Sequence, residues 1–195
     1  MQRPYLYIVI YTLGVHVLIC NLYIVICNFY TEVNLNNIPI FSVVAFSGTG
    51  KTTLLVKLVE ELKSRGLRVA VIKHDAHEFD IDHEGKDSWR FTRAGADVTA
   101  IVSGTKAAIM ENRPIPIESL IDRISDVDLI LTEGYKSGAW PKIAIQRSAT
   151  GRPLPVPAEE CFAIVTDVPV DANIPCFSLD DVSGLADLII GNVST

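Results

Sequence analysis

The stretch Phe41–Leu58, FSVVAFSGTGKTTLLVKL, decides the fold of this chain. Its apolar run, Val43–Phe46, predicts a strand that is buried on both faces. The small residues Ser47–Gly50 predict a loop, and Lys51–Thr53 open a helix whose leucines recur at helical spacing. A strand, a glycine loop and a helix in immediate succession are the layout of a phosphate-binding loop.

The residue types of this loop suit a polyphosphate. Glycines let the backbone turn so tightly that successive N–H groups point into one concavity, and the helix start adds further unpaired N–H groups. Lys51 is expected to neutralise the outer phosphates, and the Thr52 hydroxyl is placed to ligate Mg²⁺. Ala45 replaces the first glycine of the usual pattern but leaves the N–H donors in place. The alternative interpretation of the whole loop is a strand-to-helix turn that binds no ligand. The predicted phosphate-binding residues are Ser47, Gly48, Thr49, Gly50, Lys51, Thr52 and Thr53.

Length and composition narrow the class of protein. A chain of 195 residues is long enough for one α/β domain with a sizeable core. Its net charge of -6 argues against broad nucleic-acid binding. The four cysteines form no C-x-x-C pair, which argues against a zinc site or a disulfide framework and favours a reducing, intracellular setting.

The N-terminal segment has a different composition from the rest. No Asp, Glu, Lys or Arg occurs from Pro4 to Thr31, and this length exceeds what a membrane-spanning helix needs. Leu6–Ile10 recurs as Leu22–Ile26, and an internal repeat of this kind is typical of low-complexity sequence. We expect residues 1–38 to be an artefact or a dispensable extension, and residues 39–195 to form the functional domain. A membrane anchor over residues 5–30, or a set of core strands, are the alternatives.

The rest of the chain alternates strands and helices. Gly66 ends the first helix, and the strand after it completes a βαβ unit, which implies a parallel pair of strands. We therefore predict an α/β fold with a mostly parallel sheet, helices on both faces and a β-hairpin extension. The further strands are expected at 67–72, 98–103, 107–110, 128–133, 142–147, 161–166 and 174–178, and the further helices from residue 87, at 117–124 and from residue 180.

A polar stretch follows the second predicted strand. Ligands of open α/β sheets bind at the carboxyl ends of the strands, so Lys73, His74 and Asp75 are expected near the phosphates. One interpretation is a Mg²⁺ or nucleotide site that uses Asp75, Asp82 or Asp87. Another is a transition-metal site formed by His74, His77 and His83. A solvated polar loop is the third interpretation.

Two carboxylates end later predicted strands. Glu133 follows the buried run Asp128–Thr132 and resembles the second acidic element of phosphate-loop proteins, which orients Mg²⁺ or a water. Asp167 follows the strand at 161–166 and is a candidate acceptor for a guanine base. An acidic residue in a turn is the simpler interpretation of Asp167.

Taken together, these segments resemble the MobB family of molybdopterin-guanine dinucleotide biosynthesis accessory proteins, which belong to the P-loop NTPase superfamily. The resemblance covers about residues 40–190. It rests on Phe46–Leu54 (FSGTGKTTL), Ile72–Asp75 (IKHD), Phe79–Arg90, Ala94–Ala96 (AGA), Thr132–Lys136 (TEGYK) and Pro141–Ile145 (PKIAI).

The resemblance implies a cytoplasmic, homodimeric GTP-binding protein with weak hydrolysis. Its implied partner is the guanylyltransferase that joins GMP to molybdopterin, and its implied cofactors are GTP and Mg²⁺. Lys51 and Glu133 would be catalytic, and Thr52 and Glu133 would hold the metal. The residues implied to line the shared cleft are Lys73, His74, Asp75, Asp82, Asp87 and Arg90. A small-molecule kinase, or a metal-delivery GTPase that uses the three histidines, are the alternative functions.

Overall fold

The chain divides into two compact units, Met1–Asn37 and Ile38–Thr195. The computed structural model describes residues 11–12, 15–20, 23–27, 37–74 and 79–193. The first unit contains an antiparallel sheet of β1 (Tyr11–Thr12), β2 (Val15–Cys20) and β3 (Tyr23–Cys27). The described residues of the apolar segment are thus in strands. Within the described ranges, no helix is both long and apolar enough to cross a membrane.

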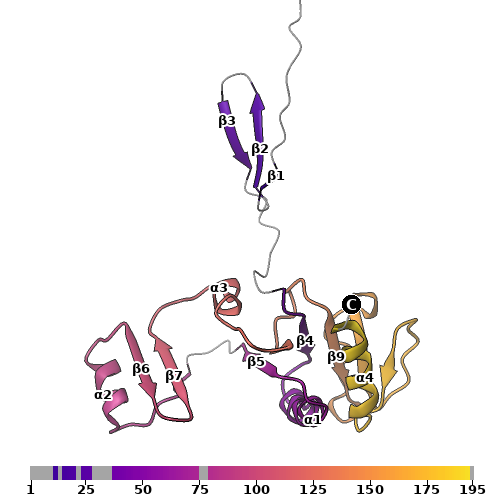
Figure 1. Ribbon diagram of the computed structural model, residues 1–195. Coiled ribbons are helices and arrows are strands. Elements are labelled where there is room, and N and C mark those ends of the chain that lie inside the picture. The colour runs from indigo at the N-terminus through magenta and orange to yellow at the C-terminus, as the bar shows by residue number, and fades with distance from the viewer. Residues whose placement is uncertain (1–10, 13–14, 21–22, 28–36, 75–78, 194–195) are drawn as a thin grey trace, which may run out of the picture. The chain divides into compact units, whose positions relative to one another are not determined.

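The second unit is built on a six-stranded sheet in the order β11-β10-β9-β4-β8-β5 (Figure 1). All five neighbouring pairs are parallel, so the strands share one carboxyl edge. The predicted α/β class is confirmed. The strands are β4 (Ile40–Val44), β5 (Val69–Lys73), β8 (Leu129–Glu133), β9 (Lys142–Gln146), β10 (Cys161–Thr166) and β11 (Cys176–Phe177).

Burial on both faces explains why the central strands are continuously apolar. Every residue of β4 is buried, and alternate side chains enter separate clusters. Phe41 and Val43 pack with α1 (Lys51–Ser64) and α4 (Val182–Val193), whereas Ile40 packs with α3 (Ile117–Ile121) on the opposite face.

Element boundaries differ from prediction where a local hydrogen bond intervenes. β4 ends at Val44 instead of Phe46, because the Phe46 carbonyl oxygen already accepts the Thr49 N–H of the loop at 3.4 Å. α3 ends at Ile121 instead of Ile124, because the N–H groups of Arg123 and Ile124 bond to carbonyl oxygens three residues back, at 3.2 and 2.9 Å. This tightening is typical of the last turn of a helix.

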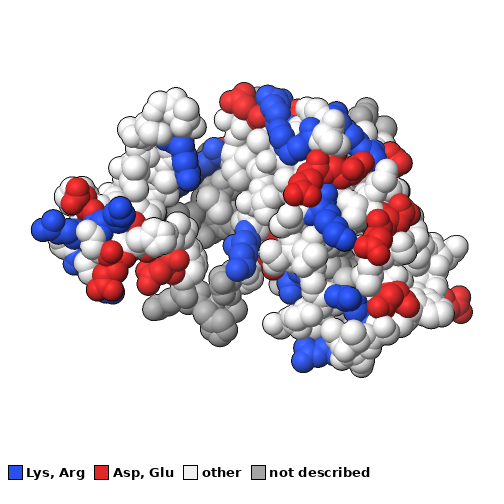
Figure 2. Space-filling view, turned by 90° about the horizontal axis from the view of Figure 1, so that it is seen from below, with Lys and Arg blue, Asp and Glu red and all other residues white. Residues whose placement is uncertain are grey.

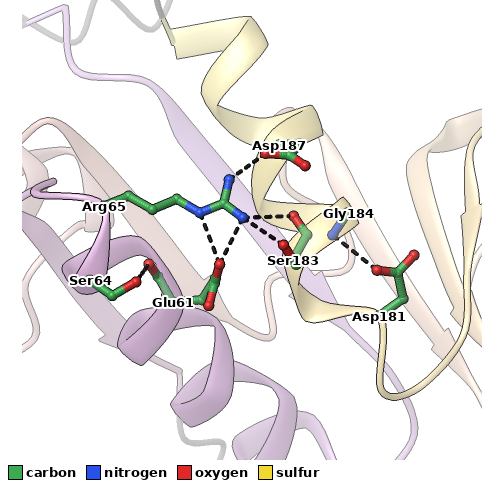
Figure 3. Close-up of polar contacts among 7 residues, drawn as sticks. All are labelled: Glu61, Ser64, Arg65, Asp181, Ser183, Gly184 and Asp187. Carbon is green, nitrogen blue, oxygen red and sulfur yellow. Dashed lines mark hydrogen bonds and ion pairs between the residues drawn. The ribbon is translucent and has the colours of Figure 1, made fainter.

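A network of hydrogen bonds joins α1 to α4 at the end of α1 (Figure 3). The Arg65 guanidinium donates two bonds to Glu61 Oε1, at 2.9 and 2.7 Å, and one to Ser183 Oγ at 2.8 Å. It also pairs with Asp187 of α4. The hydrogen bond to Glu61 is the largest cause of the raised pKa of Arg65. Both helices are thus held on the same face of the sheet.

The predicted hairpin forms a separate antiparallel sheet of β6 (Val98–Val102) and β7 (Ala107–Glu111). Helix α2 (Asp87–Arg93) packs on it, and the Thr92 and Thr99 hydroxyls lie 3.1 Å apart. Glu111, at the end of β7, forms ion pairs with Arg113 at 2.6 Å and with Arg123 beyond α3.

Basic and acidic side chains lie interspersed on the face seen in Figure 2. The ion pairs agree with this pattern, since Lys57 pairs with Asp180 at 3.1 Å and Arg68 with Asp128 at 2.8 Å. Hydrogen bonds from Arg68 lower the pKa of Asp128 to about 2. Much of the surface charge is therefore compensated locally.

Candidate functional site

The glycine loop joins the carboxyl end of β4 to the first turn of α1. Gly48 and Gly50 have φ angles of +76° and +98°, which favour residues without a Cβ. Gly50 is the N-cap of α1, and its carbonyl oxygen accepts the Leu54 N–H at 3.0 Å. The N–H groups of the first turn have no partner within the helix, so this end of α1 suits an anion.

Lys51 lies back over the loop that precedes it. Its Nζ donates to the carbonyl oxygens of Phe46 at 3.2 Å and Ala45 at 3.5 Å. No ion pair neutralises it within the part of the chain that the structure describes. The ammonium group is thus placed beside the loop with its charge uncompensated by a carboxylate.

Thr52 and Glu133 meet although 81 residues separate them in sequence. The Thr52 hydroxyl lies 3.1 Å from each carboxylate oxygen of Glu133. This contact follows from the sheet, since Val43 of β4 pairs with Glu133 of β8 and its carbonyl oxygen accepts the Gly134 N–H at 2.9 Å. A hydroxyl and a carboxylate are oxygen ligands of the kind that Mg²⁺ prefers, so this pair fits the predicted metal.

Lys73 and His74 lie at the same edge of the sheet as Glu133. Lys73 pairs with Glu133 across β5 and β8, and the His74 N–H donates to the Glu133 carbonyl oxygen at 3.0 Å. The His74 ring lies 4.7 Å from that of Tyr135, which in turn contacts Trp140 edge-on at 5.6 Å. The strand ends therefore bring a basic and an aromatic group beside the predicted metal ligands.

The other predicted cleft residues are not joined to the loop by described contacts. Asp82 accepts the N–H of His83 at 2.8 Å, and Asp87 pairs with Arg90 at 3.7 Å on the surface of α2. Asp75 and His77 lie outside the described residues. Among residues 37–74 and 79–193, no group of three or more His, Cys, Asp or Glu side chains could hold a metal ion.

Asp167 follows β10 and contacts Ser148, which lies two residues beyond the end of β9. Its two carboxylate oxygens accept the Ser148 N–H at 2.6 Å and the Ser148 hydroxyl at 2.9 Å. The backbone hydrogen bond is the main cause of its lowered pKa. Asp167 thus connects two strand ends, and recognition of a base by this residue stays a prediction.

Basic residues that sequence reasoning missed surround the loop. Lys136 Nζ lies 4.2 Å from the centroid of the Phe46 ring, and the Arg152 guanidinium lies 5.3 Å from it. Arg147 approaches Gly50 from the end of β9. Arg147 is the last residue of the strand predicted at 142–147, and Lys136 ends the TEGYK segment, but no local signal shows that either lies beside the loop. Arg152 lies in a loop without any such signal.

Comparison with known proteins places the chain in a family. Residues 40–167 match the family model of molybdopterin guanine dinucleotide synthesis protein B, MobB. The chain belongs to the MobB family. It is 37% identical over 160 residues to the molybdopterin-guanine dinucleotide biosynthesis adapter protein of Haemophilus influenzae, covering 79% of this chain and 89% of that protein. It is 38% identical over 161 residues to the Escherichia coli protein of the same name, covering 78% and 92%.

Solved MobB structures have the same fold. The crystal structure of Bacillus subtilis MobB aligns with a TM-score of 0.65 at 28% identity, covering 78% of this chain and 96% of that one. Another MobB crystal structure aligns with a TM-score of 0.61 at 30% identity, covering 80% and 99%. The match to the family model begins at residue 40, the first residue of β4, so it includes the whole MobB-like loop and helix described above.

Proposed function

We propose that this chain binds GTP and Mg²⁺ at the glycine loop and acts as an adapter in the attachment of GMP to molybdopterin. In this proposal Lys51 and the N–H groups of the loop hold the phosphates, and Thr52 and Glu133 hold the metal. Mg²⁺ would offset phosphate charge and thereby assist a weak hydrolysis of GTP. The guanylyltransferase of molybdenum cofactor biosynthesis is the proposed partner.

The contact between Thr52 and Glu133 is the observation that carries this proposal. It brings a helix-start hydroxyl and a strand-end carboxylate together beside a loop whose glycines have positive φ angles. A glycine-rich turn without a ligand has no need of either group at this place. The family supports a role in molybdopterin-guanine dinucleotide biosynthesis, since related proteins are named as adapter proteins of that pathway.

Calorimetric titration of the whole chain with GTP and with ATP, each with Mg²⁺, tests nucleotide binding. We expect saturable binding of GTP and weaker binding of ATP. A preference for ATP would favour a kinase over an adapter. Binding of neither nucleotide by the folded chain would contradict the proposal.

Lys51→Ala tests the site itself. The substitution removes the positive charge beside the loop, and we expect GTP affinity to fall at least about tenfold, which is about 1.4 kcal/mol. Lys57→Ala is the matched control, because Lys57 lies on the same helix and pairs with Asp180 at 3.1 Å. Its GTP affinity should equal that of the unaltered chain. Equal affinities of both variants would remove the basis of the site assignment.

We also propose that the chain forms a homodimer through the hairpin. Val98, Val102 and Ile109 share one face of β6 and β7, and their exposed fractions are 52%, 81% and 70%. An exposed apolar face of this kind marks an interaction surface. Ile109→Asp should shift the sedimentation coefficient to that of a monomer, whereas Val56→Asp, on the exposed side of α1, should not. A monomeric unaltered chain would contradict dimerisation.

Residues 39–195 are proposed to carry this function, with residues 1–38 as an extension outside it. The two units of the structure divide one residue from this boundary. Mass spectrometry of the protein isolated from its native cells tests the status of the extension. Peptides from residues 1–38 would contradict the hypothesis that this segment is an artefact.

A further inference from the structure

We propose that Arg147 is a phosphate-binding residue of this site, which supplies a second fixed positive charge to the polyphosphate of the nucleotide. This inference rests on the proposed binding of GTP at the loop. It adds a residue from a strand that the glycine-loop motif does not include.

The sheet brings Arg147 to the loop. Arg147 directly follows β9, and β9 pairs in parallel with β4, so both strands end at the same edge. A Cβ atom built on Gly50 would lie 3.6 Å from Arg147 Nη1. The guanidinium therefore borders the loop on the side where a side chain at position 50 would lie, directly before Lys51. A ligand that contacts the N–H groups of this loop comes within reach of the guanidinium.

The guanidinium of Arg147 has a hydrogen-bond donor without an acceptor. Its Nε atom is buried and makes no hydrogen bond in the described part of the chain. Asp167 lies near enough to be influenced by the charge of Arg147, yet its two oxygens accept hydrogen bonds from Ser148. No carboxylate forms an ion pair with Arg147 in residues 37–74 and 79–193. Arg147 is partly buried, and its buried Nε–H lacks an acceptor, so an anionic ligand is a natural complement of this guanidinium.

The surroundings of Arg147 add to the positive potential. Lys136 and Arg152 both lie over the Phe46 ring, at the base of the loop. Burial, and then the charges of Lys51 and Arg152, lower the pKa of Lys136, so these cations are close enough to repel one another. None of them has an ion-pair partner within the described ranges. A polyphosphate relieves this repulsion, and a planar guanidinium can donate two parallel hydrogen bonds to phosphate oxygens.

Two substitutions separate charge from packing. Arg147→Met keeps an unbranched side chain beside Gly50 and removes the charge, whereas Arg147→Lys keeps the charge and removes the planar donor arrangement. We expect the affinity for Mg·GTP, measured by calorimetry on the whole chain, to fall at least tenfold in Arg147→Met and by a smaller factor in Arg147→Lys. Arg93→Met, which alters an exposed arginine of α2, is the control and should bind as the unaltered chain does.

Competition by inorganic pyrophosphate identifies the part of the ligand that Arg147 contacts. Pyrophosphate should displace GTP from the unaltered chain, and its affinity should fall by a similar factor in Arg147→Met. Unchanged GTP affinity of a folded Arg147→Met chain would overturn the inference, and so would a loss confined to GTP, because that places Arg147 on the base or ribose. Should Arg147→Met not fold, an unchanged affinity in Arg147→Gln would overturn it instead. If Lys51→Ala loses binding while the Arg147 variants keep it, the proposed function stands and this inference fails.

Discussion

Removal of one hydroxyl from the buried pair Ser42 and Thr132 should destabilise the sheet beside the site. Both residues are fully buried, they face each other across β4 and β8, and the Thr132 hydroxyl donates to Ser42 Oγ at 2.9 Å. Thr132→Val keeps the shape of the side chain but leaves the Ser42 hydroxyl without this partner. A buried polar group without its partner costs about 1–3 kcal/mol.

The double substitution tests whether the two hydroxyls stabilise the fold as a pair. Ser42→Ala should lower the free energy of unfolding by a similar amount, because it leaves the Thr132 hydroxyl without its acceptor. If each single change costs about 2 kcal/mol, independent effects would total about 4 kcal/mol, whereas Ser42→Ala with Thr132→Val should cost only about 1–2 kcal/mol. The expected coupling energy is therefore about 2–3 kcal/mol.

Urea unfolding followed by tryptophan fluorescence measures all four free energies. Trp140 reports on the second unit, because its ring contacts Tyr135 just beyond β8. The slope of the free energy of unfolding against urea should stay the same in all four chains, so that midpoints report stability alone. Additive costs, within about 0.5 kcal/mol, would refute the pairing of the two hydroxyls.

Three further predictions concern the core, the surface charge and the strand end. Leu58→Ala empties a fully buried position of α1 and should lower the free energy of unfolding by about 2–5 kcal/mol, whereas Val56→Ala, 54% exposed, should change it by less than about 1 kcal/mol; urea unfolding measures both. Since Arg68 lowers the pKa of Asp128 from 3.8 to about 2, this pair stabilises the fold above about pH 4 and its contribution is lost as the pH falls toward 2. Asp128→Asn should therefore lose less stability between about pH 7 and about pH 3 than the unaltered chain, which thermal unfolding at both pH values measures. Gly134 has a φ of +105°, so Gly134→Ala should strain the residue after Glu133 by about 1–3 kcal/mol and weaken the Mg²⁺ dependence of GTP binding in calorimetry.

Features encoded within one short segment could be predicted from the sequence. The strand, loop and helix from Ile40 to Ser64 are adjacent in the chain, so hydrophobic spacing and glycine positions determine them together. Glu133 could be predicted as a strand-end carboxylate for the same reason. Its contact with Thr52 needed one further assumption, that β8 lies beside β4, and the structure contains that pairing.

Features that depend on sheet order could not be predicted in this way. Nothing in the local pattern of β9 shows that it lies between β4 and β10, yet this order brings Arg147 to Gly50. For Asp167, the position in the chain could be predicted but the contacts could not. Its place after β10 was predicted, but the two hydrogen bonds from Ser148 depend on the end of β9 being next to it.

The contacts within the loop also bear on how tightly a nucleotide can bind. Lys51 donates to two loop carbonyls, and the Thr52 hydroxyl contacts the Glu133 carboxylate. A phosphate and its metal must exchange these contacts for new ones, so the net gain in free energy is smaller than the sum of the new interactions. Arg147 stands outside this exchange, because its buried Nε–H has no hydrogen-bond partner to give up within the described residues. Its contribution to affinity should therefore be large relative to that of Lys51, and comparing Arg147→Met with Lys51→Ala in the same titration measures that ratio.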